Sequence, residues 1–255
     1  MSTGRFRALS SLPLAVVVLP ACVGEPVTEQ GRAATGLYDL FTVIAAIIFT
    51  IVAALIGWSI VRYRARGDDD TEILPKQFHA NVKLEILWFA IPQAIVIGLF
   101  IASVMVLGDV DDRVEEPEVV VRVEAFQWGW RFTYEGFDRG ADSAIVVESL
   151  PDDQAEIVLP VDTPIVFELA SRDVIHSFYV PEFFVKRDVV PGQENRLDIT
   201  IDEPGWYTAR CAEFCGLLHD RMDLEIHAVS GQRFLEWRLS MGDVPLPGYF
   251  GGGDD

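Results

Sequence analysis

The sequence predicts a transmembrane hairpin of two helices followed by an all-β domain, folded as a Greek-key sandwich or barrel. Two long uncharged segments predict the helices, and a series of short alternating segments separated by Pro, Gly and Asp predicts the strands. Of the 255 residues, 50 % are hydrophobic and 16 are Phe, which is enough apolar surface for a packed core. The composition therefore excludes a chain that is mainly disordered.

The charge is strongly acidic and unevenly distributed. The formal net charge is -19, with 8 acidic and 8 basic residues in positions 1–107 but 31 acidic and 12 basic residues in positions 108–255. Binding to nucleic acid requires clustered Lys and Arg against the phosphates. The composition therefore argues against a nucleic-acid partner and places the net charge on the β domain.

Residues 1–22 have the order of a secretory signal peptide. Arg5 and Arg7 precede an apolar run, Leu9–Pro20, that is too short to span a bilayer and is followed by a small residue and a cysteine. The segment Leu19–Cys22 resembles a bacterial lipobox, in which Cys22 is acylated. An ordinary cleaved signal with an incidental cysteine is the alternative. Both interpretations place the mature N-terminus outside the cytoplasm.

The predicted hairpin spans residues 37–107. Leu40–Val61 and Ile86–Leu107 each hold 22 residues without a formal charge. At 1.5 Å per residue each reaches about 33 Å, which is enough for a hydrocarbon core of ~30 Å. Two buried core helices of a soluble protein are the alternative, which the flanking charges disfavour.

Those charges also predict the orientation of the hairpin. The basic residues between the two segments are Arg62, Arg64, Arg66, Lys76 and Lys83. The acidic residues that follow the second segment are Asp109, Asp111, Asp112, Glu115 and Glu116. The positive-inside rule therefore places the connecting loop in the cytoplasm and the β domain outside.

Two features of the second segment bear on function. Pro92 and Gln93 interrupt it, which a helix packed against other membrane helices accommodates, so a larger membrane partner is expected. Glu85 lies at its cytoplasmic start, where a carboxylate either is solvated at the interface or opens a polar path inward. The residue alone favours the solvated interpretation.

After a linker at residues 108–118, the β domain is expected over residues 119–241, with a flexible tail at 242–255. The expected strands are Val119–Phe126, Trp130–Tyr134, Ala144–Glu148, Glu156–Leu159, Pro164–Ala170, Ser177–Val180, Arg196–Ile201, Gly205–Arg210 and Asp223–Ala228. Ser230–Met241 has helical spacing of its apolar residues, with Ser230 as the expected N-cap.

Five residues have the types and spacing of metal ligands. Without Cys211, the sequence reads as a distant histidine, His176, followed by C-x3-H-x2-M, which is the pattern of a blue-copper site. The C-x3-H-x2-M residues are Cys215, His219 and Met222. The added Cys211 changes the chemistry, because two thiolates four residues apart can bridge two copper ions, each with one terminal histidine. One electron is then shared by the pair.

Three other interpretations compete with copper. A Cys211–Cys215 disulfide is possible in an oxidising compartment, but it leaves His219 and Met222 unexplained. A Cys2His2 zinc site fits the count, although structural zinc usually has C-x2-C spacing and has no use for a thioether. In the third interpretation, His219 and Met222 are ordinary core residues. The five residues together favour copper.

Over nearly all of residues 35–240 the sequence resembles subunit II of haem-copper cytochrome c oxidases. The run Cys211–Met222 fits the family motif C-x-E-x-C-x3-H-x2-M in full. The resemblance implies a two-helix hairpin and a cupredoxin domain with a binuclear Cu(A) centre. It implies that Cys211 and Cys215 bridge the coppers and that His176 and His219 are terminal ligands. Weak ligands would be Met222 and the backbone carbonyl of Glu213, whose carboxylate would bind a magnesium ion shared with subunit I.

The resemblance also bears on residues outside that motif. Trp128, in the aromatic segment Phe126–Phe132, matches the tryptophan through which cytochrome c delivers electrons. Glu85 matches the carboxylate at the entrance of a proton path into subunit I. Asp173 matches a position that often carries an acidic docking residue, although an isolated Asp is usually just solvated. Trp130 and Phe132 are expected to be structural strand residues, and His79 and His227 match no ligand position.

The expected function is therefore that of a subunit of a respiratory oxidase in a bacterial plasma membrane. It would take electrons from cytochrome c and pass them through Cu(A) to haem in subunit I, where oxygen is reduced to water and protons are translocated. Subunit III is a further expected partner. The haem is expected only in the partner, because the chain lacks a set of membrane histidines. A quinol-oxidase subunit without copper and a membrane-anchored cupredoxin carrier are the alternatives.

Overall fold

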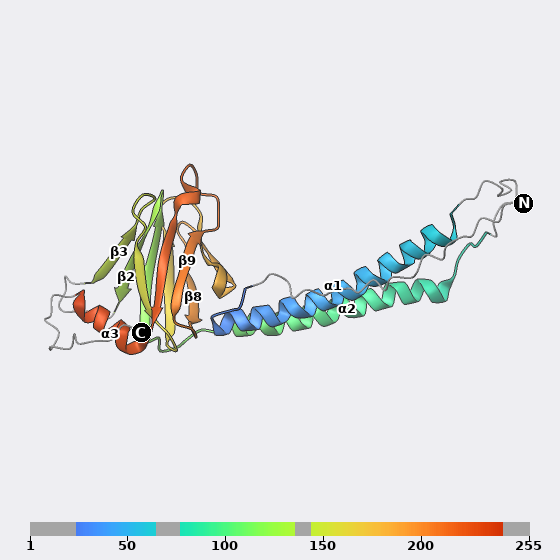
Figure 1. Ribbon diagram of the computed structural model, residues 1–255, viewed down its shortest axis with the longest axis horizontal. Coiled ribbons are helices and arrows are strands. Elements are labelled where there is room, and N and C mark those ends of the chain that lie inside the picture. The colour runs from blue at the N-terminus through green and yellow to red at the C-terminus, as the bar shows by residue number, and fades with distance from the viewer. Residues whose placement is uncertain (1–23, 65–76, 136–143, 242–255) are drawn as a thin grey trace, which may run out of the picture. The chain divides into compact units, whose positions relative to one another are not determined.

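The computed structural model describes residues 24–64, 77–135 and 144–241. The predicted signal peptide with Cys22 and the predicted tail at 242–255 lie outside these residues. The chain forms two units, one made of Met1–Gly24 and Leu40–Ala80, the other of Glu25–Asp39 and Asn81–Asp255. Figure 1 shows the helices and strands in chain order.

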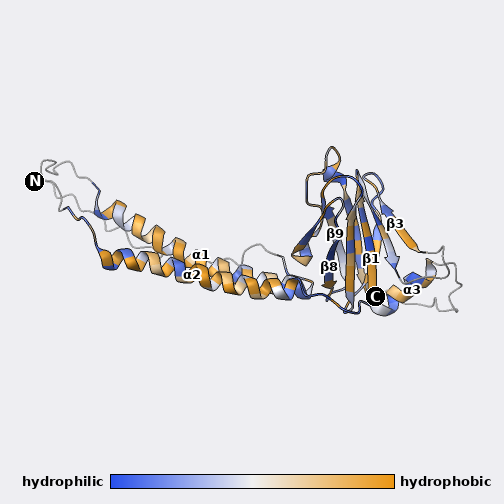
Figure 2. Ribbon diagram, turned by 180° about the vertical axis from the view of Figure 1, so that it is seen from behind, coloured by the Kyte–Doolittle hydropathy of each residue, from blue (hydrophilic) through white to orange (hydrophobic). Residues whose placement is uncertain are grey.

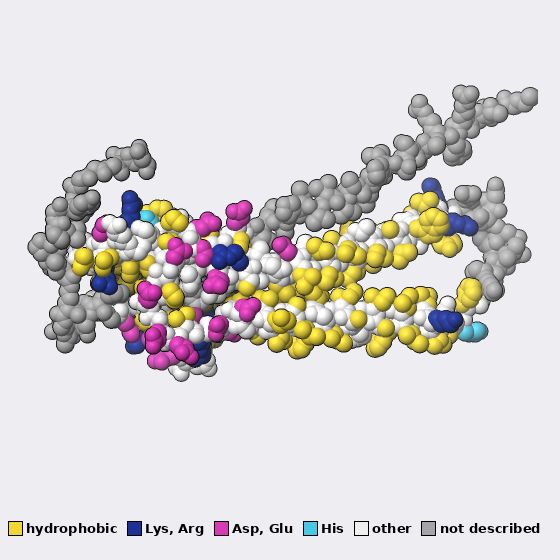
Figure 3. All heavy atoms as spheres, turned by 90° about the horizontal axis from the view of Figure 1, so that it is seen from below, with side chains coloured by type: hydrophobic (Ala, Val, Ile, Leu, Met, Phe, Trp, Pro, Cys, Tyr) yellow, Lys and Arg dark blue, Asp and Glu magenta, His cyan; other side chains and the backbone are white. Residues whose placement is uncertain are grey.

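Two helices contain the predicted membrane segments. Helix α1 spans Glu29–Arg62 and helix α2 spans Val82–Val110, and both are long and apolar enough to cross a membrane. Figure 2 shows that hydrophobic residues predominate along both helices, Figure 3 shows hydrophobic side chains over the face of them that it displays, and α2 has no buried residue. A helix that is apolar all round and unburied in its own chain suits a bilayer.

The first helix begins well before the predicted start at residue 40. The backbone N–H of Gly31 donates to Oγ1 of Thr28 at 3.0 Å, so Thr28 caps the helix ahead of its apolar part. The apolar pattern marks the part of the helix that can cross the membrane, whereas the Thr28 cap determines where the helix begins. The start of α1 is also tied to the β domain, because Val27 donates to the carbonyl of Glu182 at 3.2 Å and accepts from Asp202 at 2.8 Å.

Helix α2 has a reciprocal cap at its start. Oδ1 of Asn81 accepts from the N–H of Leu84, and Oε1 of Glu85 accepts from the N–H of Asn81, both at 3.2 Å. The Glu85 carboxylate therefore satisfies a backbone N–H at the helix N-terminus, a local role in addition to the two expected from the sequence. At its other end α2 continues to Val110, so the predicted linker at 108–118 begins inside the helix.

The β domain is a sandwich of two five-stranded sheets, which confirms the predicted fold class. The first sheet has the order β3 (Ile145–Ser149), β2 (Gly129–Glu135), β1 (Val119–Phe126), β5 (Pro164–Ser171), β8 (Asn195–Thr200). The second has the order β4 (Glu156–Pro160), β10 (Asp223–Val229), β9 (Gly205–Cys211), β6 (His176–Val180), β7 (Val185–Val189). Each sheet holds one parallel pair, β1 with β5 and β4 with β10.

One strand was not predicted. Strand β7 lies at the edge of the second sheet and pairs with β6 after a short 3-10 helix, Pro181–Phe183. Its two valines are buried, but three charged residues stand between them. Lys186 and Asp188 are exposed at this edge and Arg187 pairs with Asp111, so the alternation of apolar and polar residues that marks a strand is hidden. The nine predicted strands all occur, with ends that differ by at most one residue.

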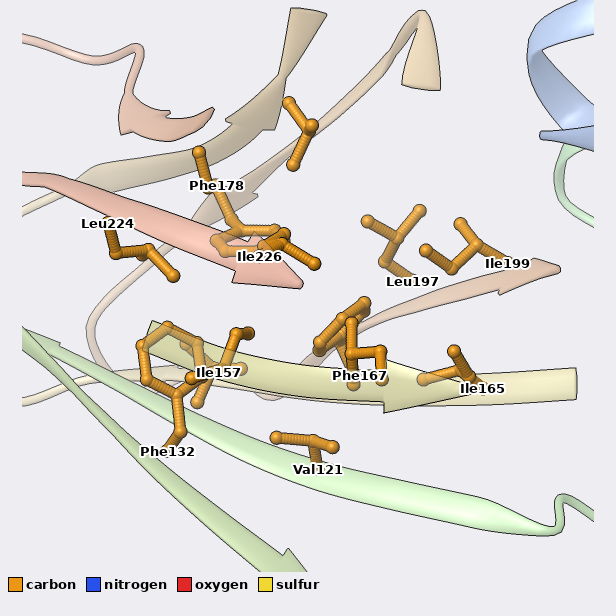
Figure 4. Close-up of a cluster of buried hydrophobic side chains, with 14 of the residues drawn as sticks. Val121, Phe132, Ile157, Ile165, Phe167, Phe178, Leu197, Ile199, Leu224 and Ile226 are labelled. Carbon is orange, nitrogen blue, oxygen red and sulfur yellow. The ribbon is translucent and has the colours of Figure 1, made fainter. Parts of the chain in front are cut away.

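The core lies between the two sheets (Figure 4). Phe132, Phe167 and Phe178 are fully buried, and the ring centroid of Phe178 lies 5.2 Å from that of Phe167 and 6.3 Å from that of Phe132. Each such side chain contributes about 1.5–3 kcal/mol through burial. Because Phe178 lies on β6, two residues after His176, this core also fixes the strand that carries a predicted ligand.

The C-terminal helix is confirmed. Helix α3 spans Gly231–Ser240, and Oγ of Ser230 accepts from the N–H of Arg233 at 3.4 Å, as the predicted N-cap should. Trp237 packs its ring 5.1 Å from that of Tyr134, which attaches the helix to the first sheet.

Candidate metal centre

Two neighbouring strands bring His176 and Cys211 together. His176 begins β6, Cys211 ends β9, and the two strands pair antiparallel with Phe178 opposite Cys211. Nδ1 of His176 consequently lies 3.8 Å from Sγ of Cys211. His176 is completely buried, so its ring is held in one place by the surrounding core.

The loop after β9 brings the other predicted ligands to Cys215. Its sulfur lies 3.9 Å from Sγ of Cys211, 3.6 Å from Nδ1 of His219 and 3.3 Å from Sδ of Met222. The loop turns at Gly216, whose φ of +121° is rarely adopted by residues with a side chain. The loop therefore places the Cys215 thiol, the His219 imidazole and the Met222 thioether beside the end of β9.

The backbone carbonyl of Glu213 also faces this cluster. The Cys211 thiol donates to it at 3.3 Å, so the carbonyl oxygen lies beside the sulfur of a predicted ligand. The Glu213 side chain is exposed to solvent. Its carbonyl and its carboxylate thus face different surroundings.

The chemistry of these donors fits copper. The ligand atoms of His176, Cys211 and Cys215 lie within 4.8 Å of one another, and both thiols are free. A disulfide requires its sulfurs about 2.05 Å apart, so the disulfide interpretation does not describe this structure. Thiolate and thioether sulfur with imidazole nitrogen is the mixture that copper prefers, whereas zinc sites do not use methionine.

The two thiols have opposite pKa shifts. Burial raises the pKa of Cys211, but bonding to His176 and to nearby backbone groups outweighs this effect and lowers the pKa to about 6. Burial and the charge of Cys211 raise the pKa of Cys215 to about 12. In His176, burial lowers the pKa while Cys211 and Asp173 raise it, with a net increase. A second thiolate therefore requires a bound cation to offset the charge of the first.

Asp173 is an exposed residue that also contacts this centre. Its Oδ1 lies 2.9 Å from Nε2 of His176, its Oδ2 accepts from the N–H of Gln127 at 2.6 Å, and its Oδ1 accepts from the N–H of Val174 at 2.7 Å. Burial raises the pKa of Asp173, but these bonds outweigh it and lower the pKa. The i, i+3 spacing to His176 was the only sequence signal for this contact.

Trp128 lies in the turn between β1 and β2, against the ligand loop. Its indole Nε1 donates to the carbonyl of Cys215 at 3.2 Å, and its side chain is half-buried. A Cβ added at Gly216 would lie 2.9 Å from Cζ2 of Trp128. The ring and the loop therefore fit together only when residue 216 is glycine.

Trp130 is buried as predicted, and it also supports the centre. Its indole donates to the carbonyl of Met222 at 3.0 Å, and its ring centroid lies 6.1 Å from that of His176. Phe132 is buried as well. The alternating pattern identified both as strand residues but carried no signal of the Met222 contact.

The remaining predicted residues have surroundings of their own. Glu85 caps α2, and His79 is an exposed residue that precedes it. His227 stacks on Trp206 with ring centroids 3.9 Å apart and pairs with Glu156 at 3.0 Å. His227 thus has an aromatic ring and a carboxylate as its partners.

Comparisons with known proteins bear on both parts of the chain. The family model for the transmembrane domain of cytochrome c oxidase subunit II matches residues 27–106, and that for its periplasmic domain matches residues 119–229. Cytochrome c oxidase subunit 2 of Alkalihalophilus pseudofirmus is 32 % identical over 250 residues, which cover 92 % of this chain and 68 % of that protein. The probable cytochrome c oxidase subunit 2 of Nocardia farcinica is 33 % identical over 265 residues, covering 80 % and 70 %.

Among solved structures, the periplasmic domain of subunit II of the cytochrome oxidase of Bradyrhizobium japonicum is similar. It is 27 % identical with a TM-score of 0.45, and the match covers 51 % of this chain and 96 % of that one. The family matches agree with the two membrane-type helices and with the His, Cys, Cys cluster. The chain therefore belongs to the cytochrome c oxidase subunit II family, and it is a copper-binding membrane subunit of a haem-copper oxidase, an oxidoreductase complex.

Proposed function

We propose that this chain accepts electrons from cytochrome c at a binuclear Cu(A) centre and passes them to haem in subunit I. Oxygen is reduced to water there, coupled to proton translocation. One observation carries the proposal. The two free sulfurs of Cys211 and Cys215 lie 3.9 Å apart, and each has one histidine nitrogen within 3.8 Å.

This arrangement supports specific roles for the ligands. Cys211 and Cys215 would bridge two copper ions, because each sulfur faces the other and has its own histidine. His176 and His219 would be the terminal ligands. The weak ligands would be Met222, whose Sδ lies 3.3 Å from Sγ of Cys215, and the Glu213 carbonyl beside Cys211. Bound copper supplies a one-electron couple, for which mixed sulfur and nitrogen ligands are suited.

The residues around the ligands prepare the centre for electron transfer. Burial of His176 and Cys215 keeps water from these ligands. Asp173 holds the proton on Nε2 of His176, which leaves Nδ1 free for the metal. Trp128 offers a half-buried ring joined to Cys215 by one hydrogen bond, and we assign to it the transfer of electrons from cytochrome c.

Further parts of the proposal concern partners and location. The exposed Glu213 carboxylate is free to bind a magnesium ion shared with subunit I, and subunit III is a second partner. The basic residues at the predicted cytoplasmic loop support an extracytoplasmic β domain in a bacterial plasma membrane. Residues 1–22 would act as a signal peptide with acylation at Cys22, which mass spectrometry of the mature N-terminus tests.

Metal analysis with EPR of the purified full-length chain in detergent tests the function. We expect two copper ions per chain and hyperfine structure from one electron shared by both nuclei. Cys215→Ser should lose this shared signal, whereas Cys22→Ser, as a matched control, should keep it. A wild-type chain that binds one copper ion, or only zinc, would disprove the binuclear centre.

A further inference from the structure

One turn contacts both halves of the metal centre. The backbone N–H of Gln127 donates to Oδ2 of Asp173 at 2.6 Å, and Oδ1 of the same carboxylate lies 2.9 Å from His176. The side-chain Nε2 of Gln127 donates to the carbonyl of Cys215 at 2.7 Å. A single residue therefore joins the carboxylate that orients one ligand to the backbone of another.

We propose that Gln127 is a positioning residue of the metal centre. Through its two hydrogen bonds it fixes the separation between the His176 side and the Cys215 side of the centre before metal binds. The inference rests on the proposed function, because it assigns a role toward the copper ions proposed there.

The topology explains why such a link is needed. Gln127 lies in the β1–β2 turn of the first sheet, whereas His176 and Cys211 lie on strands of the second. Cys215 lies on no strand, since the loop that carries it follows the end of β9. Strand pairing positions His176 and Cys211, but it does not position Cys215. A bond from the facing sheet supplies this constraint.

Two donors converge on the carbonyl of Cys215. The Gln127 amide is at 2.7 Å and the Trp128 indole at 3.2 Å, so the amide makes the shorter bond. A carbonyl oxygen has two lone pairs and can accept both. The close approach at Gly216 extends the contact, because a Cβ there would lie 3.2 Å from Nε2 of Gln127. Gln127 and Trp128 of the turn thus approach Cys215 and Gly216 of the loop.

Loss of the amide should change the centre in two measurable ways. Without the Gln127 amide, the Cys215 carbonyl loses the shorter of its two hydrogen bonds. Copper binding must then also order the loop, which lowers the copper affinity. Outer partners of metal ligands typically contribute 10–100-fold to metal affinity, and one exposed amide should lie at the lower limit, about tenfold. The positive end of the amide also points toward Cys215 and favours the reduced centre, so its removal should lower the reduction potential.

The test compares four full-length chains in detergent. They are the wild type, Gln127→Ala, Gln127→Glu and, as the control, Gln154→Ala. Gln154 is exposed and lies in a loop before β4, outside the metal centre. Copper affinity is measured by competition with a Cu(I) chelator, the potential by redox titration of the copper absorption, and folding by circular dichroism.

We expect affinity and potential to fall in the order wild type and Gln154→Ala, then Gln127→Ala, then Gln127→Glu. The glutamate has the size of glutamine, but it cannot donate when ionised and it repels the carbonyl oxygen. The circular dichroism of Gln127→Glu should match that of the wild type. A lower copper affinity in this variant would then be due to the lost hydrogen bond and not to misfolding.

The outcomes separate this inference from the proposed function. If the wild type does not bind two copper ions, the proposed function fails. If it binds two, and both Gln127 variants keep the wild-type affinity and potential, the role of Gln127 is wrong while the binuclear centre stands. An equal loss in Gln154→Ala would also overturn the inference, because the effect would not be specific to the turn.

Discussion

The carboxylate of Asp173 lies 2.9 Å from Nε2 of His176, and the other ring nitrogen of this histidine lies 3.8 Å from the sulfur of Cys211. The two nitrogens therefore face different partners. A carboxylate on one nitrogen fixes the ring orientation and the tautomer, so the other nitrogen is held toward the metal.

Removal of this carboxylate should weaken copper binding. We expect Asp173→Ala to lower copper affinity by roughly 10–100-fold, as is usual for the outer partner of a histidine ligand. Asp173→Asn keeps an oxygen for His176 and should lose less. Chelator competition measures both, with Asp152→Ala as the control because its side chain is 92 % exposed. Equal affinity in Asp173→Ala and the control would contradict this role.

The two thiols of the metal-free chain should titrate far apart. The pKa of Cys211 is lowered to about 6 and that of Cys215 is raised to about 12. Ultraviolet absorbance of the thiolate, measured in a Cys22→Ser background, should therefore rise first near pH 6. Cys211→Ser should remove this step, and Cys215→Ser should keep it. A first step near the ordinary thiol pKa of 9.0 in Cys215→Ser would show that His176 does not stabilise the Cys211 thiolate.

The same shifts determine a pH dependence. Because the folded-state pKa of Cys211 lies below the ordinary thiol value of 9.0, its contribution to stability is complete above about pH 9 and is lost as the pH falls through about 6. Copper binding at neutral pH must displace a proton from Cys215 but not from Cys211. Copper affinity should therefore fall as the pH is lowered.

Trp128→Ala should slow the reduction of the centre by ferrocytochrome c. Copper content should be unchanged at saturating copper, because Trp128 is proposed as a conduit and not as a ligand. Trp128→Phe keeps an aromatic ring but loses the indole donor to Cys215, so its reduction rate should lie between those of the wild type and Trp128→Ala. Stopped-flow reduction measures these rates, with Trp206→Ala as the control, since that ring is 57 % exposed and stacks on His227. Equal rates in Trp128→Ala and this control would remove Trp128 from the route.

Glu85→Gln separates two roles of one side chain. The amide oxygen can still accept from Asn81 and preserve the helix cap, but the side chain can no longer carry a proton. If Glu85 opens the proton path, the variant oxidase should show slower turnover with normal reduction of the copper centre. Steady-state oxygen consumption and stopped-flow reduction measure the two steps. Turnover equal to the wild type would leave Glu85 with its capping role alone.

The association of a basic cytochrome c with the oxidase should depend strongly on salt. Positions 108–255 hold 31 acidic and 12 basic residues, and Figure 3 shows acidic side chains gathered on the β domain. Exposed charges are screened beyond about 8 Å at physiological salt, so the bimolecular rate should fall as ionic strength rises. Stopped-flow rates across a salt series measure this. A rate independent of salt would disprove electrostatic steering.

The sequence by itself determined the elements and the candidate ligands. Uncharged length predicted both membrane segments, alternation predicted nine of the ten strands that the described residues form, and the spacing from Cys211 to Met222 predicted the donor types of the site. These features are local, because periodicity and ligand spacing within a loop can be read from neighbouring residues. Strand β7 was missed since its exposed charges conceal the same periodicity.

Only the tertiary structure decided which residues support those ligands. Gln127 in the β1–β2 turn and Trp130 on β2 reach Cys215 and Met222 across 88 and 92 residues of sequence, and Asp173 reaches His176 from the loop before β6. No spacing rule encodes the contacts of Gln127 and Trp130, because they depend on how two sheets face each other around a shared core. The ligand types are a property of the local sequence, whereas their orientation and pKa values are properties of the packed sandwich.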